Sequence, residues 1–312
     1  MVAKRPWANL STMVTASDRN CVVCASNELR LHLRVGGDAG PDGLIPSTDR
    51  FGTALSDIVR CQVCGHMQLL QFPSDDELTH AYGDAASEDY VEEADGQRAT
   101  ARSVLAQLER FASPGPILDL GCWTGYLLDE ARSRGWEPVG IEPSAFASTF
   151  ARDRLGLEVR TENLNQTVLP ESHFRAAVMG DVIEHLTDPA RALDRVRRTL
   201  EPNGVLCLML PDAGSAVARR MGARWWSVLP THVQYFTRSS LKALLERHGF
   251  NILQVTTQPK AFSVRYYLGR IGGYSPRVAR ALIRGAELTG VADRMWAPDF
   301  RDRMLVLARA RP

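Results

Sequence analysis

Two pairs of cysteines have the spacing of metal ligands. Cys21 and Cys24 form one C-x2-C pair, in "NCVVCAS", and Cys61 and Cys64 form the other, in "RCQVCGH". This spacing lets both sulfurs of a pair reach the same tetrahedral ion, so we predict a closed, structural Zn2+ site that carries out no chemistry itself. A redox dithiol or four unrelated buried thiols are the alternatives. His66 could replace one ligand, but it is more simply a neighbour of the site.

A second set of residues with chemical potential begins in "ILDLGCWTGYLL", at residues 117–128, which reads as a strand, a glycine turn and the start of a helix. Gly121 and Gly125 would let the backbone approach a ligand closely, and cofactors bind at such turns in open parallel sheets. The segment matches neither the G-x-G-x-x-G pattern nor the P-loop, so we do not expect it to cradle a phosphate. Asp119 and Cys122 belong to the same turn.

Further polar groups follow the next apolar runs. Glu142 ends the run "VGIE", and a carboxylate at this place could accept two hydrogen bonds without offering a competing donor. The segment "MGDVIEHLTDP", at residues 179–189, then brings Asp181, Glu184 and His185 together at the end of another apolar run. In "LEPNGVLCLMLP", at residues 200–211, the Pro-Asn-Gly sequence predicts a turn before a strand.

The elements that would position these groups alternate along the chain. We expect a helix in residues 97–111, and then strands and helices in turn from residue 115 onward. The expected strands are 116–120, 138–143, 157–160, 176–181, 204–211, 251–258 and 303–310, and the expected helices begin near 126, 144, 189 and 238. Thr237 would cap the last helix and Gly249 would end it. This alternation predicts an α/β fold with a parallel sheet covered by helices on both faces.

Taken in order, the four segments resemble the motifs of class I S-adenosylmethionine-dependent methyltransferases. The resemblance implies a Rossmann-like seven-stranded methyltransferase sheet, with S-adenosyl-L-methionine as the cofactor. In this family Glu142 would accept hydrogen bonds from both ribose hydroxyls. The cofactor-binding residues implied by the resemblance are Asp119, Gly121, Cys122, Gly125, Glu142 and Asp181.

The chain also departs from the pattern of this family. Trp123 replaces the middle glycine of the loop, and Arg175 stands where the family usually has an acidic residue before the fourth strand. The adenine contact would come from the segment "TENLNQT", where we expect Asn163 or Leu164.

Two C-x2-C pairs ahead of such a core resemble a bacterial group of sugar and natural-product methyltransferases. The organisation we expect has a small zinc-ribbon-like module before the catalytic domain. Its parts are a flexible extension (1–20), the zinc-binding module (21–75), a helical linker or lid (76–112) and the methyltransferase domain (113–312), with acceptor-binding insertions at about 211–236 and 258–300. Tyr82 and Tyr90 could close over the cofactor from the lid, or simply pack.

The acceptor would bind beside "RWWSVLPTHVQYF", at residues 224–236. Methyl transfer to a hydroxyl needs a base, and histidine has a suitable pKa near neutrality. His232 is our first candidate for the catalytic base and His185 our second, although a histidine among aromatic side chains can also be structural. Glu184 could orient His185 or bind substrate. Trp225 and Trp226 could stack on an acceptor or belong to the core.

Composition narrows the class of partner. The chain has 312 residues with a net charge of +1, yet residues 211–312 alone carry about +11, so the acceptor could be anionic. No secretory signal or membrane-length apolar window is evident, and we expect a cytoplasmic protein. We therefore expect O-methylation of a small-molecule or saccharide acceptor. An RNA methyltransferase or a non-catalytic zinc-stabilised binding module are the alternatives, and nucleic acid is disfavoured because the cysteine module is net acidic.

Overall fold

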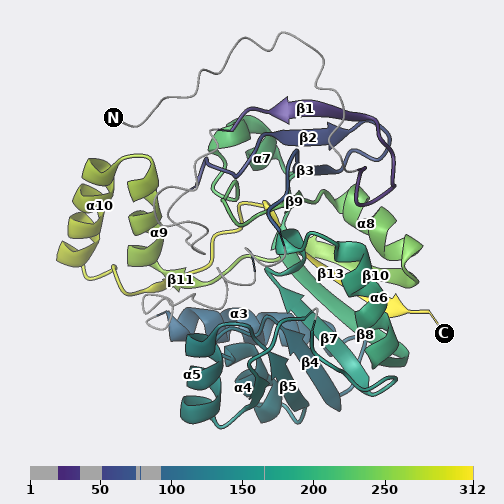
Figure 1. Ribbon diagram of the computed structural model, residues 1–312. Helices are drawn as coiled ribbons and strands as arrows, with labels where there is room; N and C mark the ends of the chain where they lie inside the picture. The colour runs from purple at the N-terminus through teal and green to yellow at the C-terminus, as the bar shows by residue number, and fades with distance from the viewer. Residues whose placement is uncertain (1–19, 36–50, 75–77, 79–92, 165, 312) are drawn as a thin grey trace, which may run out of the picture.

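The computed structural model describes residues 20–35, 51–74, 78, 93–164 and 166–311. Its largest feature is a seven-stranded sheet. The strands are β4 (Pro116–Leu120), β5 (Glu137–Ile141), β6 (Glu158–Arg160), β7 (Phe174–Gly180), β8 (Leu200–Pro211), β10 (Phe250–Thr257) and β13 (Arg303–Ala310). They lie in the order β10-β13-β8-β7-β4-β5-β6, and Figure 1 labels all of them except β6. The predicted α/β methyltransferase sheet is thus present.

One strand departs from the expected parallel arrangement. The strands β4 to β8 run parallel to one another, whereas β13 is antiparallel to both of its neighbours, β8 and β10. The chain leaves β10 and returns through the insertion before β13, so it re-enters the sheet in the opposite direction. A second difference concerns the predicted turn at 202–204, which lies inside β8. Asn203 has a φ of +66° there, and the register between β7 and β8 shifts.

Helices cover both faces of this sheet. The helices are α3 (Ala94–Leu108), α4 (Tyr126–Ser133), α5 (Ala145–Leu155), α6 (Pro189–Thr199) and α8 (Arg238–Arg247). Strand β13 shows how the two faces alternate, because Leu305 and Leu307 pack in the cluster with α3 and α4. Met304 and Val306 pack in the opposite cluster with α6 and α8. The expected caps are present, since Thr237 forms a capping box with Ser240 and Gly249 follows α8 with a φ of +82°.

A smaller antiparallel sheet carries the cysteine pairs. It consists of β1 (Leu29–Leu33), β2 (Ile58–Cys61), β3 (Met67–Leu69) and β9 (Gln234–Tyr235), in that order. Strand β9 comes from the chain beyond β8, so the expected module of residues 21–75 shares its sheet with the large domain. Its cysteines also pack in the same apolar cluster as α6 and α8. A module this small gains a core by joining the core of its neighbour.

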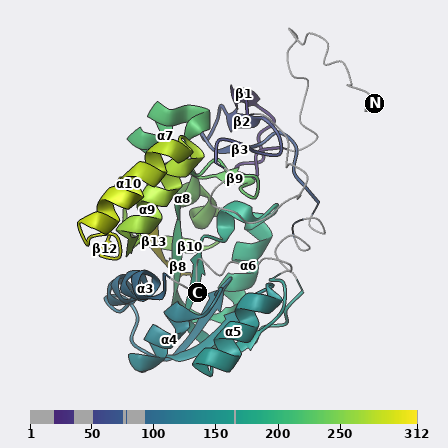
Figure 2. The same ribbon diagram turned by 90° about the vertical axis from the view of Figure 1, so that its left-hand side faces the viewer.

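The two expected insertions lie beside the carboxyl ends of the central strands. The first contains α7 (Ala216–Met221) and leads into β9. The second contains β11 (Phe262–Ser263), α9 (Val264–Arg270), α10 (Pro276–Leu288) and β12 (Met295–Trp296). Figures 1 and 2 show α9 and α10 as a pair of helices beside the small sheet. Among the described residues, no helix is long and apolar enough to cross a membrane.

Candidate functional site

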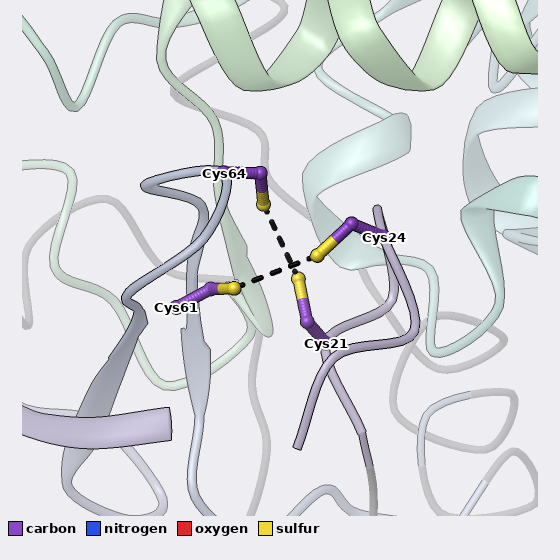
Figure 3. Close-up of side chains that lie close together, drawn as sticks. All are labelled: Cys21, Cys24, Cys61 and Cys64. Atoms are coloured by element: carbon purple, nitrogen blue, oxygen red, sulfur yellow. Dashed lines mark hydrogen bonds between the residues drawn. The ribbon is translucent and has the colours of Figure 1, made fainter. Parts of the chain in front are cut away.

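The four cysteines of the two C-x2-C pairs converge on one point (Figure 3). The sulfurs of Cys21 and Cys64 lie 3.5 Å apart, and so do those of Cys24 and Cys61. Tetrahedral coordination with metal–sulfur bonds of about 2.3 Å places neighbouring sulfurs roughly 3.8 Å apart, so the four thiols fit a single metal ion with little movement. His66 is not part of the cluster, because its buried ring instead faces Gln234.

The glycine turn after β4 brings backbone to the edge of a large cavity. Gly121 has a φ of +74°, and a Cβ at this position would lie 2.5 Å from Val182 Cγ2. Both the conformation and the contact require glycine. Asp119, Gly121, Cys122 and Trp123 all line the cavity. This part of the expected cofactor loop is therefore assembled where a ligand could reach it.

Gly125, the last glycine of the loop, has a different role in the structure. Gly125 is the N-cap of α4, with a φ of +81°, and it is not among the residues that line the cavity. A Cβ there would lie 2.7 Å from Leu157 Cδ1 and 3.0 Å from Ala151 Cβ. Gly125 therefore allows α4 to pack closely against the segment that contains α5 and the start of β6. We expected Gly125 to bind the cofactor, but in the structure it supports the loop through helix packing and does not line the cavity.

Trp123 adopts the backbone conformation that a glycine would adopt. Its φ is +49°, in the left-handed region that costs a residue with a Cβ about 1 kcal/mol or more. The backbone N–H of Trp123 donates a 2.8 Å hydrogen bond to Glu142 Oε2. Its ring lies 6.5 Å from that of Phe146. The departure from the family pattern thus preserves the turn and adds an aromatic wall to the cavity.

Glu142 is held at the carboxyl end of β5 by two backbone donors. Oε2 accepts from Trp123 N–H, and Oε1 accepts from Ser144 N–H, both at 2.8 Å. Each carboxylate oxygen has two acceptor sites, so each retains one for a ligand. The side chain is buried at 4% exposure yet lines the cavity. This is the geometry needed to bind two neighbouring hydroxyl groups.

Burial makes the two carboxyls at this end of the cavity unusually weak acids. Burial raises the pKa of Asp119 to about 7, and the nearby charge of Glu142 adds to the effect. Burial also raises the pKa of Glu142 to about 7, although the two backbone donors oppose it. Each group therefore favours an additional hydrogen-bond donor or a proton, because an isolated buried carboxylate is costly. Asn163 and Leu164, the two candidates for the adenine contact, also line the cavity.

At the other end, Asp181 lies between two cations from distant parts of the chain. Lys260 Nζ approaches Asp181 Oδ2 at 2.5 Å, and Arg303 forms an ion pair with Oδ1. Burial would raise the pKa of Asp181, but these two cations hold it well below its usual range. The expected cofactor residue is thus already paired in this structure. The sequence did not identify Lys260 or Arg303 as partners of Asp181. It showed only that basic residues are frequent in residues 211–312.

The two candidate bases lie together in the cavity wall. The rings of His185 and His232 are 4.6 Å apart and nearly perpendicular. His185 Nδ1 lies 2.9 Å from the Thr231 carbonyl, and His232 Nδ1 lies 2.8 Å from the Ser227 carbonyl. A carbonyl only accepts, so Nδ1 carries the proton in both rings and Nε2 carries the lone pair. Burial lowers the pKa of both residues, which keeps both rings neutral.

Glu184 is a fully buried carboxyl beside the two histidines. Both carboxylate oxygens are buried and have no hydrogen-bond partner among the described residues. Burial, with a contribution from Asp181, raises the pKa of Glu184 to about 8. One of its carboxylate oxygens lies within 4.8 Å of a ring nitrogen of His185 and of a ring nitrogen of His232. At neutral pH the carboxyl is mainly protonated, so it faces these two rings as a neutral group.

Aromatic side chains form the remaining wall of the cavity. Trp226 lines it, whereas Trp225 is buried in the core of the small sheet. The indole nitrogens of both tryptophans donate to Asp302 Oδ2, at 3.2 Å from Trp225 and 2.7 Å from Trp226. Asp302 also escaped the sequence analysis, since no motif surrounds it. Other aromatic residues of the wall are Phe262, Tyr266, Tyr267, Trp296 and Phe300.

The cavity is large enough for two ligands. Its volume is about 1550 Å3, and it extends from Glu142 past Asp181 to His232. A single drug-sized ligand occupies a pocket of roughly 300–1,000 Å3, so the space exceeds what one cofactor needs. Arg175 lies away from it and donates to the Pro114 carbonyl at 2.7 Å. Tyr82 and Tyr90, the expected lid residues, lie outside the described residues.

Comparison with known proteins identifies the domain. A family model described as "Methyltransferase domain" matches residues 91–255, more than half of the chain. The chain belongs to this methyltransferase family. These residues include the glycine loop, Glu142 and the Asp181–His185 segment, and they extend through His232. The match thus covers both ends of the cavity.

Individual relatives are more distant. A ubiquinone biosynthesis O-methyltransferase from Rhodopseudomonas palustris is 28% identical over 155 residues, covering 46% of this chain and 59% of that protein. One from Dinoroseobacter shibae is 29% identical over 166 residues, covering 47% of this chain and 67% of that protein. The chain thus spans about three fifths of the length of such curated relatives. A solved structure of a SAM-dependent methyltransferase from Thermotoga maritima is 18% identical, covers 72% of this chain and 95% of its own, and has a TM-score of 0.49.

Proposed function

We propose that this protein transfers the methyl group of S-adenosylmethionine to a hydroxyl of a small-molecule or saccharide acceptor. One observation carries the proposal: a single cavity joins a carboxylate suited to a ribose, Glu142, to a pair of neutral histidines, His185 and His232. The two ends lie at the carboxyl ends of parallel strands, where ligands bind in sheets of this kind.

The cofactor end would hold S-adenosylmethionine through backbone and carboxylate groups. Glu142 would accept hydrogen bonds from the two ribose hydroxyls with its two remaining acceptor sites, while Trp123 and Ser144 keep its orientation. Gly121 and Cys122 would let the backbone approach the amino acid part of the cofactor. When bound, the cofactor supplies an electrophilic methyl group on a sulfonium. The chain has only to orient it and exclude water.

The acceptor end would supply the base. His232 Nε2 would take up the proton of the acceptor hydroxyl as its oxygen receives the methyl group. Nε2 holds the lone pair because Nδ1 donates to the Ser227 carbonyl at 2.8 Å. The lowered pKa of His232 keeps this nitrogen unprotonated at neutral pH, and it makes the ring a weaker base than a histidine whose pKa lies near neutrality. His185 would be the second acceptor, 4.6 Å away between ring centres.

The acceptor class follows from the walls of the cavity. Trp226 and Tyr267 offer flat apolar surfaces on which a sugar or an aromatic ring could stack. The charges of Lys260 and Arg303 are balanced by Asp181 and by the neighbouring Asp302, which favours a neutral acceptor. O-methylation also agrees with the names of the two curated relatives, although these belong to proteins of a different length.

The four-cysteine cluster would bind one Zn2+ as a structural ion. The donor set consists of four thiolates, which leaves no open position for a substrate. The cluster contributes no residue to the described wall of the cavity. Its role would be to hold the small sheet in place beside the acceptor end.

Calorimetric titration of zinc-loaded protein with S-adenosylmethionine and S-adenosylhomocysteine tests this proposal. We expect binding that Glu142→Ala weakens and His232→Ala retains. With an acceptor found by screening sugars and phenolic natural products, His232→Ala should lower turnover by the roughly 10²–10⁴-fold that a general base contributes. Failure of the wild-type protein to bind either ligand would refute the function. Undiminished turnover of His232→Ala would refute the assignment of the base alone.

A further inference from the structure

A buried hydrogen-bonded path connects the small sheet to the acceptor end of the cavity. His66 Nε2 lies 3.0 Å from Gln234 Oε1, and Gln234 Nε2 donates to the Leu186 carbonyl at 3.0 Å. His66 and Gln234 are at most 1% exposed. Gln234 therefore joins two segments that are far apart in the sequence and have no other reason to share a side chain.

The Leu186 carbonyl, at the end of this path, fixes which group donates and which accepts in each hydrogen bond. The Leu186 carbonyl can only accept, so the amide nitrogen of Gln234 must face it and the amide oxygen must face His66. His66 must then carry its proton on Nε2 to donate. A different amide orientation or tautomer would break the path, because two donors or two acceptors would meet. The path is thus specific for a glutamine at this position.

The segment that accepts the hydrogen bond from Gln234 contains His185, one of the two candidate bases. Leu186 directly follows His185, whose ring Nδ1 donates to the Thr231 carbonyl at 2.9 Å. In the same region Val233 N–H donates to the Glu184 carbonyl at 3.0 Å. Three hydrogen bonds therefore clamp the segment 184–186 to the segment 231–234. The bond from Gln234 is the one that continues into the small sheet.

The other end of the path rests on the cysteine cluster. The backbone N–H of His66 donates to the Cys64 sulfur, and the His66 carbonyl accepts from Cys61 N–H at 2.8 Å. The strand that follows, β3, pairs with β9, with Gln68 directly opposite Gln234. The position of the His66 ring therefore depends on the geometry of the two cysteines that precede it.

We propose that Gln234 is a positioning residue, which transmits the geometry of the four-cysteine cluster through His66 to the backbone of Leu186 and so sets the place of His185. This inference rests on the proposed function, because it gives His185 a role beside the acceptor. Its physical basis is that β9 has only two residues, so its backbone pairing alone constrains the segment weakly. A displacement of about 1 Å in such a segment can lower turnover on the order of 10²-fold.

A matched pair of variants tests the inference. Gln234→Met removes both bonds of the path and retains the side-chain length. Gln68→Met is the control, because Gln68 is equally buried and lies opposite Gln234, but its Oε1 accepts from Val22 N–H at 3.0 Å and is not part of the path. Both variants are compared with the wild type in the zinc-loaded form, after the zinc content has been measured. The ring signals of His185 and His232 are followed by NMR in protein labelled with 13C at histidine Cε1.

We expect Gln234→Met to move or broaden the His185 signal and Gln68→Met to leave it in place, while both variants bind S-adenosylhomocysteine as the wild type does. An unchanged His185 signal in Gln234→Met would overturn the inference, and so would equal changes in both variants. These signals are recorded without ligand, so the result stands even if the wild type binds no cofactor. That outcome would refute the proposed function separately.

A second variant keeps the test decisive if Gln234→Met does not fold. In Gln234→Leu, an apolar side chain occupies the buried position and can neither accept from His66 nor donate to the Leu186 carbonyl. We expect the His185 signal to change. A His185 signal identical to that of the wild type would overturn the inference.

Discussion

Replacing Glu142 with glutamine should change how the stability of the ligand-free protein depends on pH. The wild-type carboxyl is 4% exposed, and its pKa is raised from 4.5 to about 7, mainly by burial. A raised pKa means that the folded state binds a proton more tightly than the unfolded state does. The contribution of Glu142 to stability is thus largest below about pH 4.5, and ionisation of Glu142 lowers the free energy of unfolding as the pH rises through 4.5 towards 7 and above. Glu142→Gln has no such titration.

The magnitude follows from the two pKa values. A pKa raised from 4.5 to about 7 corresponds to about 3 kcal/mol when the group is fully ionised. Between pH 5.5 and pH 8.5 the wild type should lose about 2 kcal/mol of this amount. The variant carries an offset of its own at every pH, because its amide nitrogen would meet a backbone N–H of Trp123 or Ser144. Subtracting the free energy of unfolding at one pH from that at the other cancels this offset.

Urea unfolding of both proteins at pH 5.5 and pH 8.5, in the zinc-loaded form, measures the effect. The wild type should lose about 2 kcal/mol more than the variant between the two pH values. Asp119 titrates in both proteins, and its pKa should fall in the variant, because the charge of Glu142 contributes to raising it. Equal losses of unfolding free energy in the two proteins between pH 5.5 and pH 8.5 would refute the reasoning. They would mean that Glu142 is solvated or paired in the folded protein.

Three further predictions concern other parts of the site. Gly121→Ala should lower the free energy of unfolding by about 1–3 kcal/mol in urea, because its Cβ would collide with Val182 at a positive φ; a stability equal to wild type would contradict this. Asp181→Asn should leave two cations in the cavity, so added chloride or phosphate should raise the melting temperature more than it does for wild type; equal salt responses would count against it. Cys61→Ser should lower the zinc content measured by elemental analysis below one ion per chain, and full retention would exclude the four-thiolate site.

The end of the cavity proposed to bind the cofactor could be predicted because its signals are local. Gly121 and Glu142 follow apolar runs at short spacing, and the parallel strands bring the ends of those runs to one edge of the sheet. The two C-x2-C pairs were predictable for the same reason, since two thiols on one tight turn can share an ion. Even Trp123 kept the turn, because the surrounding strand and helix impose its positive φ.

The acceptor end was less predictable because its contacts join distant residues. Asp181 pairs with Lys260 and Arg303, and Asp302 receives the indoles of Trp225 and Trp226. No periodic pattern marks a single lysine, arginine or aspartate as the partner of a residue 76 to 122 positions away. Composition showed only that basic residues gather in the last third of the chain. Which of them enter the cavity depends on how the insertion folds.

The fold also explains why the two ends differ in this way. The cofactor end is built from β4, β5 and their following turns, which must keep one geometry for the sheet to pack. The acceptor end combines the segment after β7, the loop before β9 and the insertion between β10 and β13. A change in the insertion can therefore alter the acceptor pocket without disturbing the loop that holds Glu142. The small sheet is joined to the acceptor end, because β9 pairs with β3 and Gln234 contacts His66, which follows the second cysteine pair.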